Sequence, residues 1–185
     1  MEADWEVEIG AGAPIIDALW AGYVDLTTAP ALVKLLAEVA LLPQLEQALL
    51  RLNDLRSPVW TAKCDVWPIA DTNDLDPDEL DASVEDTAFA WCCYVDLLPR
   101  GEQWSDAAQA VGFGRSICGQ LQEIPFRCCR ADLVVRGATM SPDELAVGIT
   151  AYLTACGATE EAAKQVLGQA LTALTDALCG QSAIE

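Results

Sequence analysis

The sequence predicts an α+β protein with a four-stranded antiparallel sheet that carries helices on one face, the ferredoxin-like split βαβ sandwich. Four runs are typical of strands, at residues 5–9, 57–68, 87–99 and 126–136. Helical patterns lie between the first and second runs and between the third and fourth, and two more follow the last run. The prediction therefore assigns residues 1–137 to the sandwich and residues 138–185 to a C-terminal helical hairpin packed on the same domain.

The strand predictions rest on alternation of apolar and polar residues, because successive side chains of a strand point to opposite faces. In the run 57–68 the expected inward residues are Trp60, Ala62, Cys64 and Val66. In the run 87–99 they are Phe89, Trp91, Cys93, Val95 and Leu97, and in the last run Cys129, Ala131, Leu133 and Val135. The opposite face, left open by the helices, then presents charged side chains of both signs.

The helix predictions rest on apolar stripes and on start and stop residues. A helical pattern begins at Pro30 and restarts after Pro43, and Ser105 is the expected N-cap of a helix that Pro125 stops. The sequence Ser141-Pro-Asp-Glu predicts a strong helix start, with an apolar stripe that runs to Gly157. Another helix is expected from Thr159 to Gly180, whereas residues 15–29 are compatible with either helix or extended chain.

The charge of the chain restricts its partners. Ten Lys and Arg against 29 Asp and Glu give a formal net charge of −19. This field repels phosphate backbones and anionic lipid and attracts basic surfaces, so direct nucleic-acid binding is excluded. No apolar run reaches the ~20 residues that span a bilayer, and the acidic start of the chain is unlike a secretory signal. We therefore expect a cytoplasmic protein, with no membrane partner.

The chain has no histidine, which excludes Ser-His and Cys-His catalysis. Its eight cysteines form no Cys-x-x-Cys motif, and we expect them to be reduced and mostly buried. Among them Cys128 and Cys129 have neighbouring arginines, Arg127 and Arg130, which favour a thiolate nucleophile, but buried strand cysteines explain the same pattern. No catalytic residue, metal ligand or cofactor is predicted from these residue types.

The segment Val7-Glu-Ile-Gly-Ala-Gly-Ala-Pro resembles the glycine-rich first loop of S-adenosylmethionine-dependent methyltransferases. In that family a strand ends in an acidic residue and glycines let the backbone approach the cofactor. The resemblance implies that Gly10 and Gly12 contact S-adenosylmethionine. Pro14 departs from it, and a strand followed by a turn is the alternative interpretation.

The segment 71–86 carries eight carboxylates and no basic residue. The spacing from Asp74 to Glu85 imitates a calcium-binding loop, but Glu79 replaces the glycine of the sharp turn. The favoured alternative is a helix start with Asp76 as cap and Pro77 at the first position.

These observations favour a non-catalytic acidic protein that binds a basic partner protein, such as a bacterial toxin-neutralising immunity protein or an inhibitor. The expected partner-binding residues are the acidic loop and two flanking aromatics, namely Trp67, Asp71, Asp74, Asp76, Asp78, Glu79, Asp81, Glu85, Asp86 and Tyr94. The alternative is a small-ligand or enzymatic module that binds an anionic group or S-adenosylmethionine through Lys63, Arg130, Arg136, Gly10 and Gly12. A homodimer formed through the open sheet face is compatible with both hypotheses.

Overall fold

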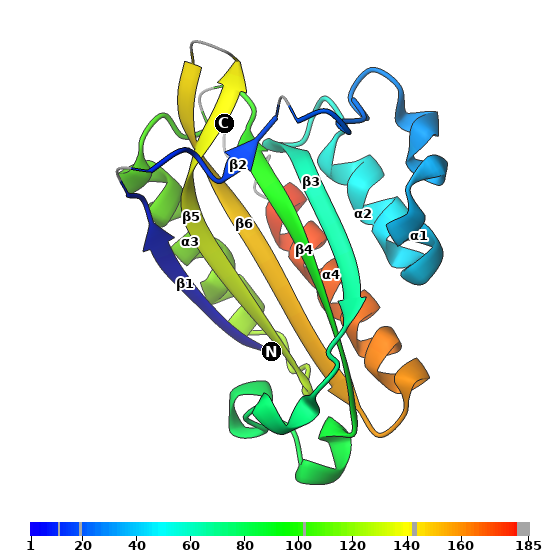
Figure 1. The fold of residues 1–185 in the computed structure, drawn as a ribbon. Helices are drawn as coiled ribbons and strands as arrows, with labels where there is room; N and C mark the ends of the chain where they lie inside the picture. Colours follow the sequence, from blue (N-terminus) through cyan, green and yellow to red (C-terminus); the bar gives the residue numbers. More distant parts are fainter. Residues whose placement is uncertain (11, 19, 102, 142–143, 181–185) are drawn as a thin grey trace.

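The computed structural model describes residues 1–10, 12–18, 20–101, 103–141 and 144–180. These residues build one mixed sheet of six strands with helices on one of its faces (Figure 1). The strands are β1 Glu2–Glu8, β2 Ile16–Asp17, β3 Val59–Pro68, β4 Phe89–Pro99, β5 Cys129–Ser141 and β6 Glu144–Gly157. The α-helices are α1 Ala37–Leu41, α2 Gln44–Leu52, α3 Ala107–Gln122 and α4 Glu160–Gly180, and the 3-10 turns are η1 Pro30–Leu35, η2 Thr72–Asp74, η3 Asp78–Leu80 and η4 Val84–Thr87.

The strand order shows that the ferredoxin-like prediction is wrong. The order is β1-β5-β6-β4-β3, with the short β2 also paired to β5. The strands β1 and β2 run parallel to β5, whereas all other neighbours are antiparallel. The sheet is therefore mixed rather than antiparallel. Its central strand is β6, in a segment for which the sequence predicts a helix.

The predicted C-terminal helical hairpin is wrong for the same reason. Residues 144–157 form β6, and only the second predicted helix exists, as α4. In β6 Ile149, Ala151 and Leu153 alternate with Thr150 and Tyr152, and the first three are buried against the helix layer. The apolar residues Leu145, Ile149 and Leu153 of this segment also recur at helical spacing, and this spacing favours the wrong element. The adjoining strand β5 crosses the expected boundary at residue 137.

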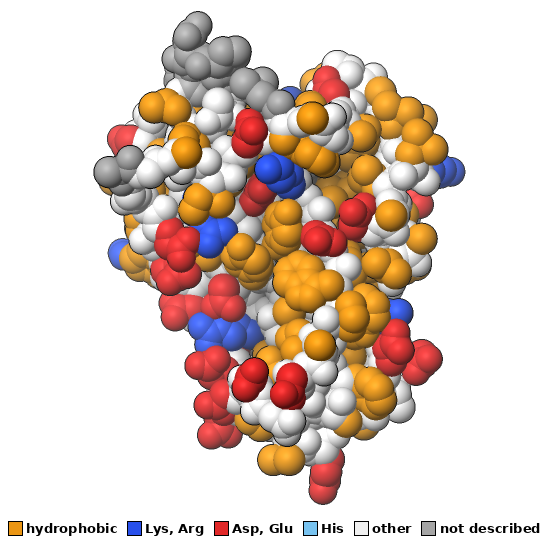
Figure 2. Space-filling view, viewed as in Figure 1, with side chains coloured by type: hydrophobic (Ala, Val, Ile, Leu, Met, Phe, Trp, Pro, Cys, Tyr) orange, Lys and Arg blue, Asp and Glu red, His pale blue; other side chains and the backbone are white. Residues whose placement is uncertain are grey.

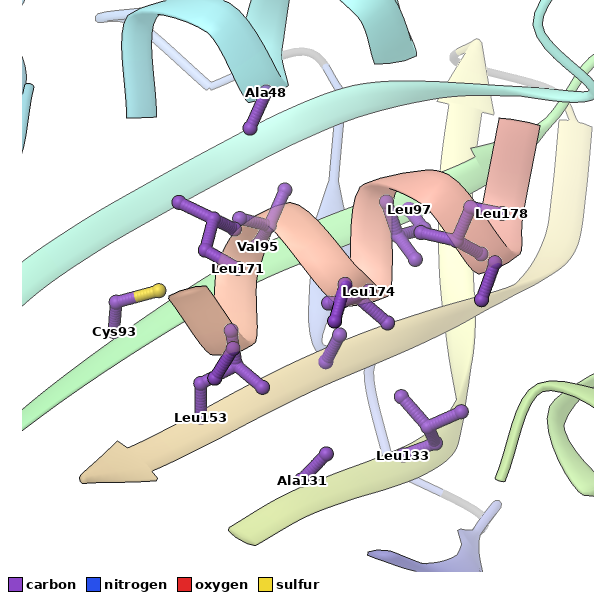
Figure 3. Packing of buried hydrophobic residues seen from close by; sticks show 14 of the residues in the cluster. Ala48, Cys93, Val95, Leu97, Ala131, Leu133, Leu153, Leu171, Leu174 and Leu178 are labelled. Atoms are coloured by element: carbon purple, nitrogen blue, oxygen red, sulfur yellow. The ribbon is translucent and has the colours of Figure 1, made fainter. Parts of the chain in front are cut away.

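The core lies between the sheet and the helix α4. Leu171, Leu174 and Leu178 of α4 point toward the strands β4, β6 and β5, and each is at most 1% exposed (Figure 3). They meet Val95 and Leu97 of β4 and other buried residues of the sheet, including Cys93, Leu153, Leu133 and Ala131 (Figure 3). The burial of one such leucine contributes about 1.5–3 kcal/mol. Helix α3 packs mainly on β1 and β5, and α2 packs on α4 and β3.

The start of helix α3 lies one residue later than the expected cap at Ser105. The N-cap is Asp106, whose side chain accepts a hydrogen bond of 2.9 Å from the amide of Gln109. Ser105 instead donates its own amide to the side chain of Gln109 at 2.8 Å. Both residue types are good caps, so the sequence alone does not distinguish these adjacent positions.

A β-bulge in β3 changes which of its residues face the helices. The pairing of β3 with β4 shifts between Thr61 and Cys64. Val59 before the bulge and Cys64 and Val66 after it pack in the main core. The prediction is correct for Cys64 and Val66 but wrong for Trp60 and Ala62, which pack in a separate cluster on the other face. An extra residue in a strand reverses the alternation, and the sequence alone does not reveal the bulge.

The sheet face opposite the helices is covered at both ends and uncovered in the middle. At one end Ile16 and Ala18 pack on residues of β3, β4 and β5, namely Ala62, Leu98 and Ala138. At the other end Leu80 of the segment 69–87 packs on Ala90 and Cys156. In Figure 1 β2 crosses the upper end of the strands and the segment 69–87 folds over their lower end. The uncovered centre lies between these two segments.

Candidate functional site

The centre of the uncovered sheet face is a row of cross-strand neighbours. Asp65 of β3 lies opposite Tyr94 of β4, Tyr94 opposite Tyr152 of β6, and Tyr152 opposite Asp132 of β5. The ring centroids of Tyr94 and Tyr152 are 5.8 Å apart, and that of Trp67 is 6.1 Å from Tyr94. Neighbours in such a row interact directly because their Cβ atoms are about 5 Å apart. The sheet therefore holds two tyrosines between two carboxylates.

A further carboxylate, Asp96, lies two residues after Tyr94 on the same face of β4. We call Asp65, Trp67, Tyr94, Asp96 and Tyr152 together the central open face. Figure 2 shows hydrophobic side chains gathered in the middle of this side of the molecule, with acidic and basic side chains around them. Aromatic rings bordered by charge are typical of the anchoring positions of protein interfaces.

The position of the Asp96 carboxylate disfavours its ionised form because the side chain is buried. The side chain is only 5% exposed, and its Oδ1 accepts a hydrogen bond of 2.6 Å from the Thr150 hydroxyl. Burial raises the pKa of Asp96 above its ordinary 3.8, although the Thr150 hydrogen bond, Lys63 and Arg136 act in the opposite direction. Burial also raises the pKa of Tyr94 to about 12, aided by Asp96 and Asp65. Tyr94 is therefore neutral at physiological pH.

We expect Asp96→Asn to stabilise the protein at pH 7. Because the pKa of Asp96 is higher in the folded state, the folded protein binds its proton more tightly, and stability falls as pH rises from 3.8 through the raised pKa. Asparagine keeps an oxygen for Thr150 and has no charge to desolvate. Chemical denaturation from pH 3 to pH 8 should give a free energy of unfolding that exceeds the wild-type value most at neutral pH. An equal or lower stability at pH 7 would contradict this account.

The three basic residues of the alternative ligand-binding prediction do not converge on one point. Arg136 donates to Glu8 at 2.6 and 2.8 Å and to the Tyr152 hydroxyl at 2.8 Å, and its guanidinium lies 5.4 Å from the centre of that ring. The ammonium of Lys63 lies over the Trp20 ring.

Arg130 donates to Asp132 at 2.8 Å and lies 3.5 Å from Glu79 and 4.0 Å from Asp4. Each of the three cations thus contacts a carboxylate or an aromatic ring of the protein itself. The geometry gives an anion-binding role for these residues no support.

The acidic loop, residues 71–86, belongs to the segment 69–87 and therefore lies at one end of the sheet face, beside the central open face. Its Glu79 is the member that reaches across to Arg130 of β5. Asp81 pairs with Arg127 at 3.0 Å, and Asp86 accepts hydrogen bonds from Ser83. The structure therefore places Trp67, Tyr94 and the acidic loop on one side of the molecule.

Further acids of the loop organise its turns or face solvent. Asp71 accepts a hydrogen bond from the amide of Asn73, and Asp76 accepts one from the amide of Asp78 at 2.9 Å. The predicted start after Asp76 is thus present, but it opens the short 3-10 turn η3 rather than an α-helix. Among the described residues no ion pair joins Asp74, Asp78 or Glu85, and all three are exposed. These three carboxylates leave the loop with uncompensated negative charge.

The described part of the chain offers few groups for metal binding or for thiol chemistry. There, no group of three or more Asp, Glu or Cys side chains is placed to hold a metal ion. Burial raises the pKa of every cysteine thiol, to about 11 at Cys129 and about 12 at Cys64. A thiol two pKa units above its ordinary value has about 100-fold less thiolate at neutral pH. At Cys128 burial outweighs the pKa-lowering effect of Arg127, and at Cys129 burial is the largest influence on the thiol pKa.

Two of the hollows outside the central open face bear on the small-ligand hypothesis. Gly10 and Gly12 line one of about 350 Å³ between the end of β1 and the β5–β6 hairpin, and the chain runs from there into β2 rather than into a helix. Another, of about 700 Å³, lies on the helix layer between α3 and α4. It is bordered by glutamines, small residues and Asp176, whose carboxylate pairs with Arg51 at 2.6 Å. Its lining is nearly neutral and offers little charge to attract a ligand.

The predicted site residues include neither Tyr152 nor the carboxylates Asp65 and Asp96. The pattern assigns Tyr152 to a helix stripe, which hides its position beside Tyr94. The signal that could have found it is the alternation of Thr150, Tyr152 and Thr154, since β-branched and aromatic residues favour strands. The pattern places Asp65 on the open face but does not distinguish it from the many other acids.

Comparison of the chain with protein-family models, with curated proteins and with solved structures finds no significant match. In the described residues, none of the helices is both long enough and apolar enough to cross a lipid bilayer. The function must therefore be inferred from the site itself.

Proposed function

We propose that the protein is a non-catalytic binding protein that engages a basic partner protein through the central open face and the neighbouring acidic loop. Toxin-neutralising immunity proteins and inhibitors are the class with this chemistry. The observation that carries the proposal is that half-buried aromatic rings and carboxylates that form no ion pair among the described residues lie on one uncovered face of a chain with net charge −19. The acidic field speeds the encounter with a positively charged surface, and the aromatic side chains provide the buried contact area.

The charge of the loop gives the first test. We expect the triple variant Asp74→Asn, Asp78→Asn and Glu85→Gln to associate more slowly with the partner. The partner is captured from native cells on the immobilised wild-type protein, identified, and purified for stopped-flow measurement. Between about 50 and 300 mM salt the wild-type association rate should fall at least ~10-fold, because screening weakens steering.

A matched control removes three charges from the helix layer, with Glu46→Gln, Glu123→Gln and Glu161→Gln. It has the same net charge as the loop variant but should keep most of the association rate. An association rate that does not depend on salt, or a partner without a basic surface, would contradict the proposed function.

A thermal-shift measurement with nucleotides and S-adenosylmethionine distinguishes the small-ligand hypothesis from the proposed function. A ligand that binds only the folded state raises the melting temperature. The hollow at Gly10 and Gly12 is where S-adenosylmethionine would bind on this hypothesis, and a clear shift with this compound would favour it over the proposed function.

A further inference from the structure

On the central open face of the described chain, two carboxylates that form no ion pair lie beside the rings of Tyr94 and Trp67, which carry no cation. Among the described residues no ion pair joins Asp65 or Asp96, and no lysine or arginine lies over the rings of Tyr94 or Trp67. The second oxygen of Asp96, Oδ2, accepts no hydrogen bond from these residues. It also keeps some contact with solvent, because in the described chain only Arg100 Nε is both fully buried and unbonded. The site thus combines carboxylate hydrogen-bond acceptors with aromatic ring faces that no cation of the described chain covers.

On the neighbouring part of the same face, an arginine of the protein itself already binds a tyrosine ring and a carboxylate together. The guanidinium of Arg136 lies over Tyr152 and bonds both its hydroxyl and a carboxylate, that of Glu8. Tyr94 lies beside Tyr152 in the row, with Asp65 directly opposite it on the other side. The chain therefore satisfies one tyrosine–carboxylate pair with its own arginine and leaves the adjacent pair open.

We propose that Tyr94, Asp65 and Asp96 form a subsite for an arginine side chain of the basic partner. This inference rests on the proposed function and adds the residue that is recognised. A planar guanidinium stacks on an aromatic ring and donates to two carboxylates at once, whereas an ammonium is a strongly hydrated point charge. The arriving positive charge also offsets the cost of keeping Asp96 ionised in its buried position.

A second copy of this chain is a poorer occupant of the same face. Two copies would bring together two surfaces that each carry part of a net charge of −19, and this repulsion opposes association. The protein's own arginines on this face are already engaged by Glu8 and Asp132.

The test uses synthetic nine-residue peptides with three arginines in a Gly-Ser background, and the same peptides with lysine or with uncharged citrulline at those positions. Binding to the full-length protein is followed by ¹H–¹⁵N chemical-shift perturbation and calorimetry at low and physiological salt. We expect the arginine peptide to shift amides of β3, β4 and β6 around Tyr94. The lysine peptide should bind at least ~5-fold more weakly, and the citrulline peptide should show no binding.

Variants distinguish specific binding at the subsite from general attraction to the negative charge of the protein. The double variant Asp65→Asn and Asp96→Asn, and separately Tyr94→Leu, should each weaken the arginine peptide about 10-fold, the size of one desolvated cation–π or charged contact. The control Asp74→Asn and Asp78→Asn has the same charge as the double variant and should change affinity less than about 3-fold. The variant Asp96→Asn alone should keep the fold, so a loss of affinity together with a gain of stability would mark a binding role.

Several results would overturn the subsite. These are equal affinity for the arginine and lysine peptides, equal losses in the double variant and its control, or no binding of any peptide to the wild type. The proposed function is tested separately by the salt dependence with the natural partner, so it can survive each of these results. If sedimentation shows a dimer that Tyr94→Leu dissociates, the occupant is a second copy and the arginine subsite is wrong.

Discussion

The variant Leu153→Ala should unfold with a free energy about 3–4 kcal/mol below the wild-type value. Leu153 lies in the central strand β6 with 0% exposure, and helix α4 covers it (Figure 3). Truncation removes its transfer free energy and leaves a cavity that the surrounding leucines fill only in part. Urea denaturation followed by circular dichroism measures the loss.

Leu145→Ala is the matched control, because Leu145 belongs to the same strand and is 77% exposed. Its substitution should change the free energy of unfolding by less than about 0.5 kcal/mol. A helix over this segment would place both leucines on one buried stripe. Equal losses in the two variants would therefore contradict the position of β6 in the sheet.

The variant Gly148→Ala should lower the free energy of unfolding by about 1–3 kcal/mol, because it forces an extra atom into a tightly packed crossing. A Cβ at this position would lie 2.7 Å from Cδ1 of Ile16 and 2.9 Å from the carbonyl oxygen of Leu97. The Leu97 backbone lies in β4 and cannot yield, so we expect β2 to lift from the sheet. Hydrogen exchange should then speed up at the amides of Ile15 and Ala18, which bond to Gly137 and Thr139.

Gly119→Ala is the opposite case and serves as its control. Gly119 lies inside α3, and a Cβ added there would have no other atom within 4 Å, so alanine should stabilise the helix by about 1 kcal/mol. If Gly148→Ala is as stable as the wild type, β2 does not cross the sheet as closely as the structure shows.

The elements that the sequence predicted correctly carry a clear local signal. In β3 and in the helices α3 and α4 apolar positions contrast with polar ones, and the 3.6 and 2.0 residue periods are then distinct. The strand β4 is buried along nearly its whole length, but its aromatic residues and the closing Pro99 are typical of a strand and its end. The failure at β6 has a cause in the sequence, since its Ser-Pro-Asp-Glu start is typical of a helix and Leu145, Ile149 and Leu153 recur at helical spacing. Because β6 is predicted as a helix, the predicted number of strands, strand order and C-terminal hairpin are also wrong.

The parallel pairing of β1 could not be inferred from local pattern. Glu2–Glu8 pairs with Arg130–Arg136, and the opposite charges of Glu2 and Arg130 and of Glu8 and Arg136 are weak hints at the register. Sequence patterns report which face of a strand is buried but not which strand lies beside it. Trp67 and Tyr94 are predicted together because they flank one loop, whereas Tyr152 is reached only through the strand order.

The position of β6 in the chain has a consequence for folding. This strand joins β4 to β5, and among the described residues β1 pairs in the sheet with β5 alone, so β1 must wait for a partner strand that lies more than 120 residues later in the chain. Closing such long loops slows the search for the native arrangement. We therefore expect the β3–β4 hairpin, whose strands are close in the sequence, to form first and the β1–β5 pair to complete the sheet late in folding.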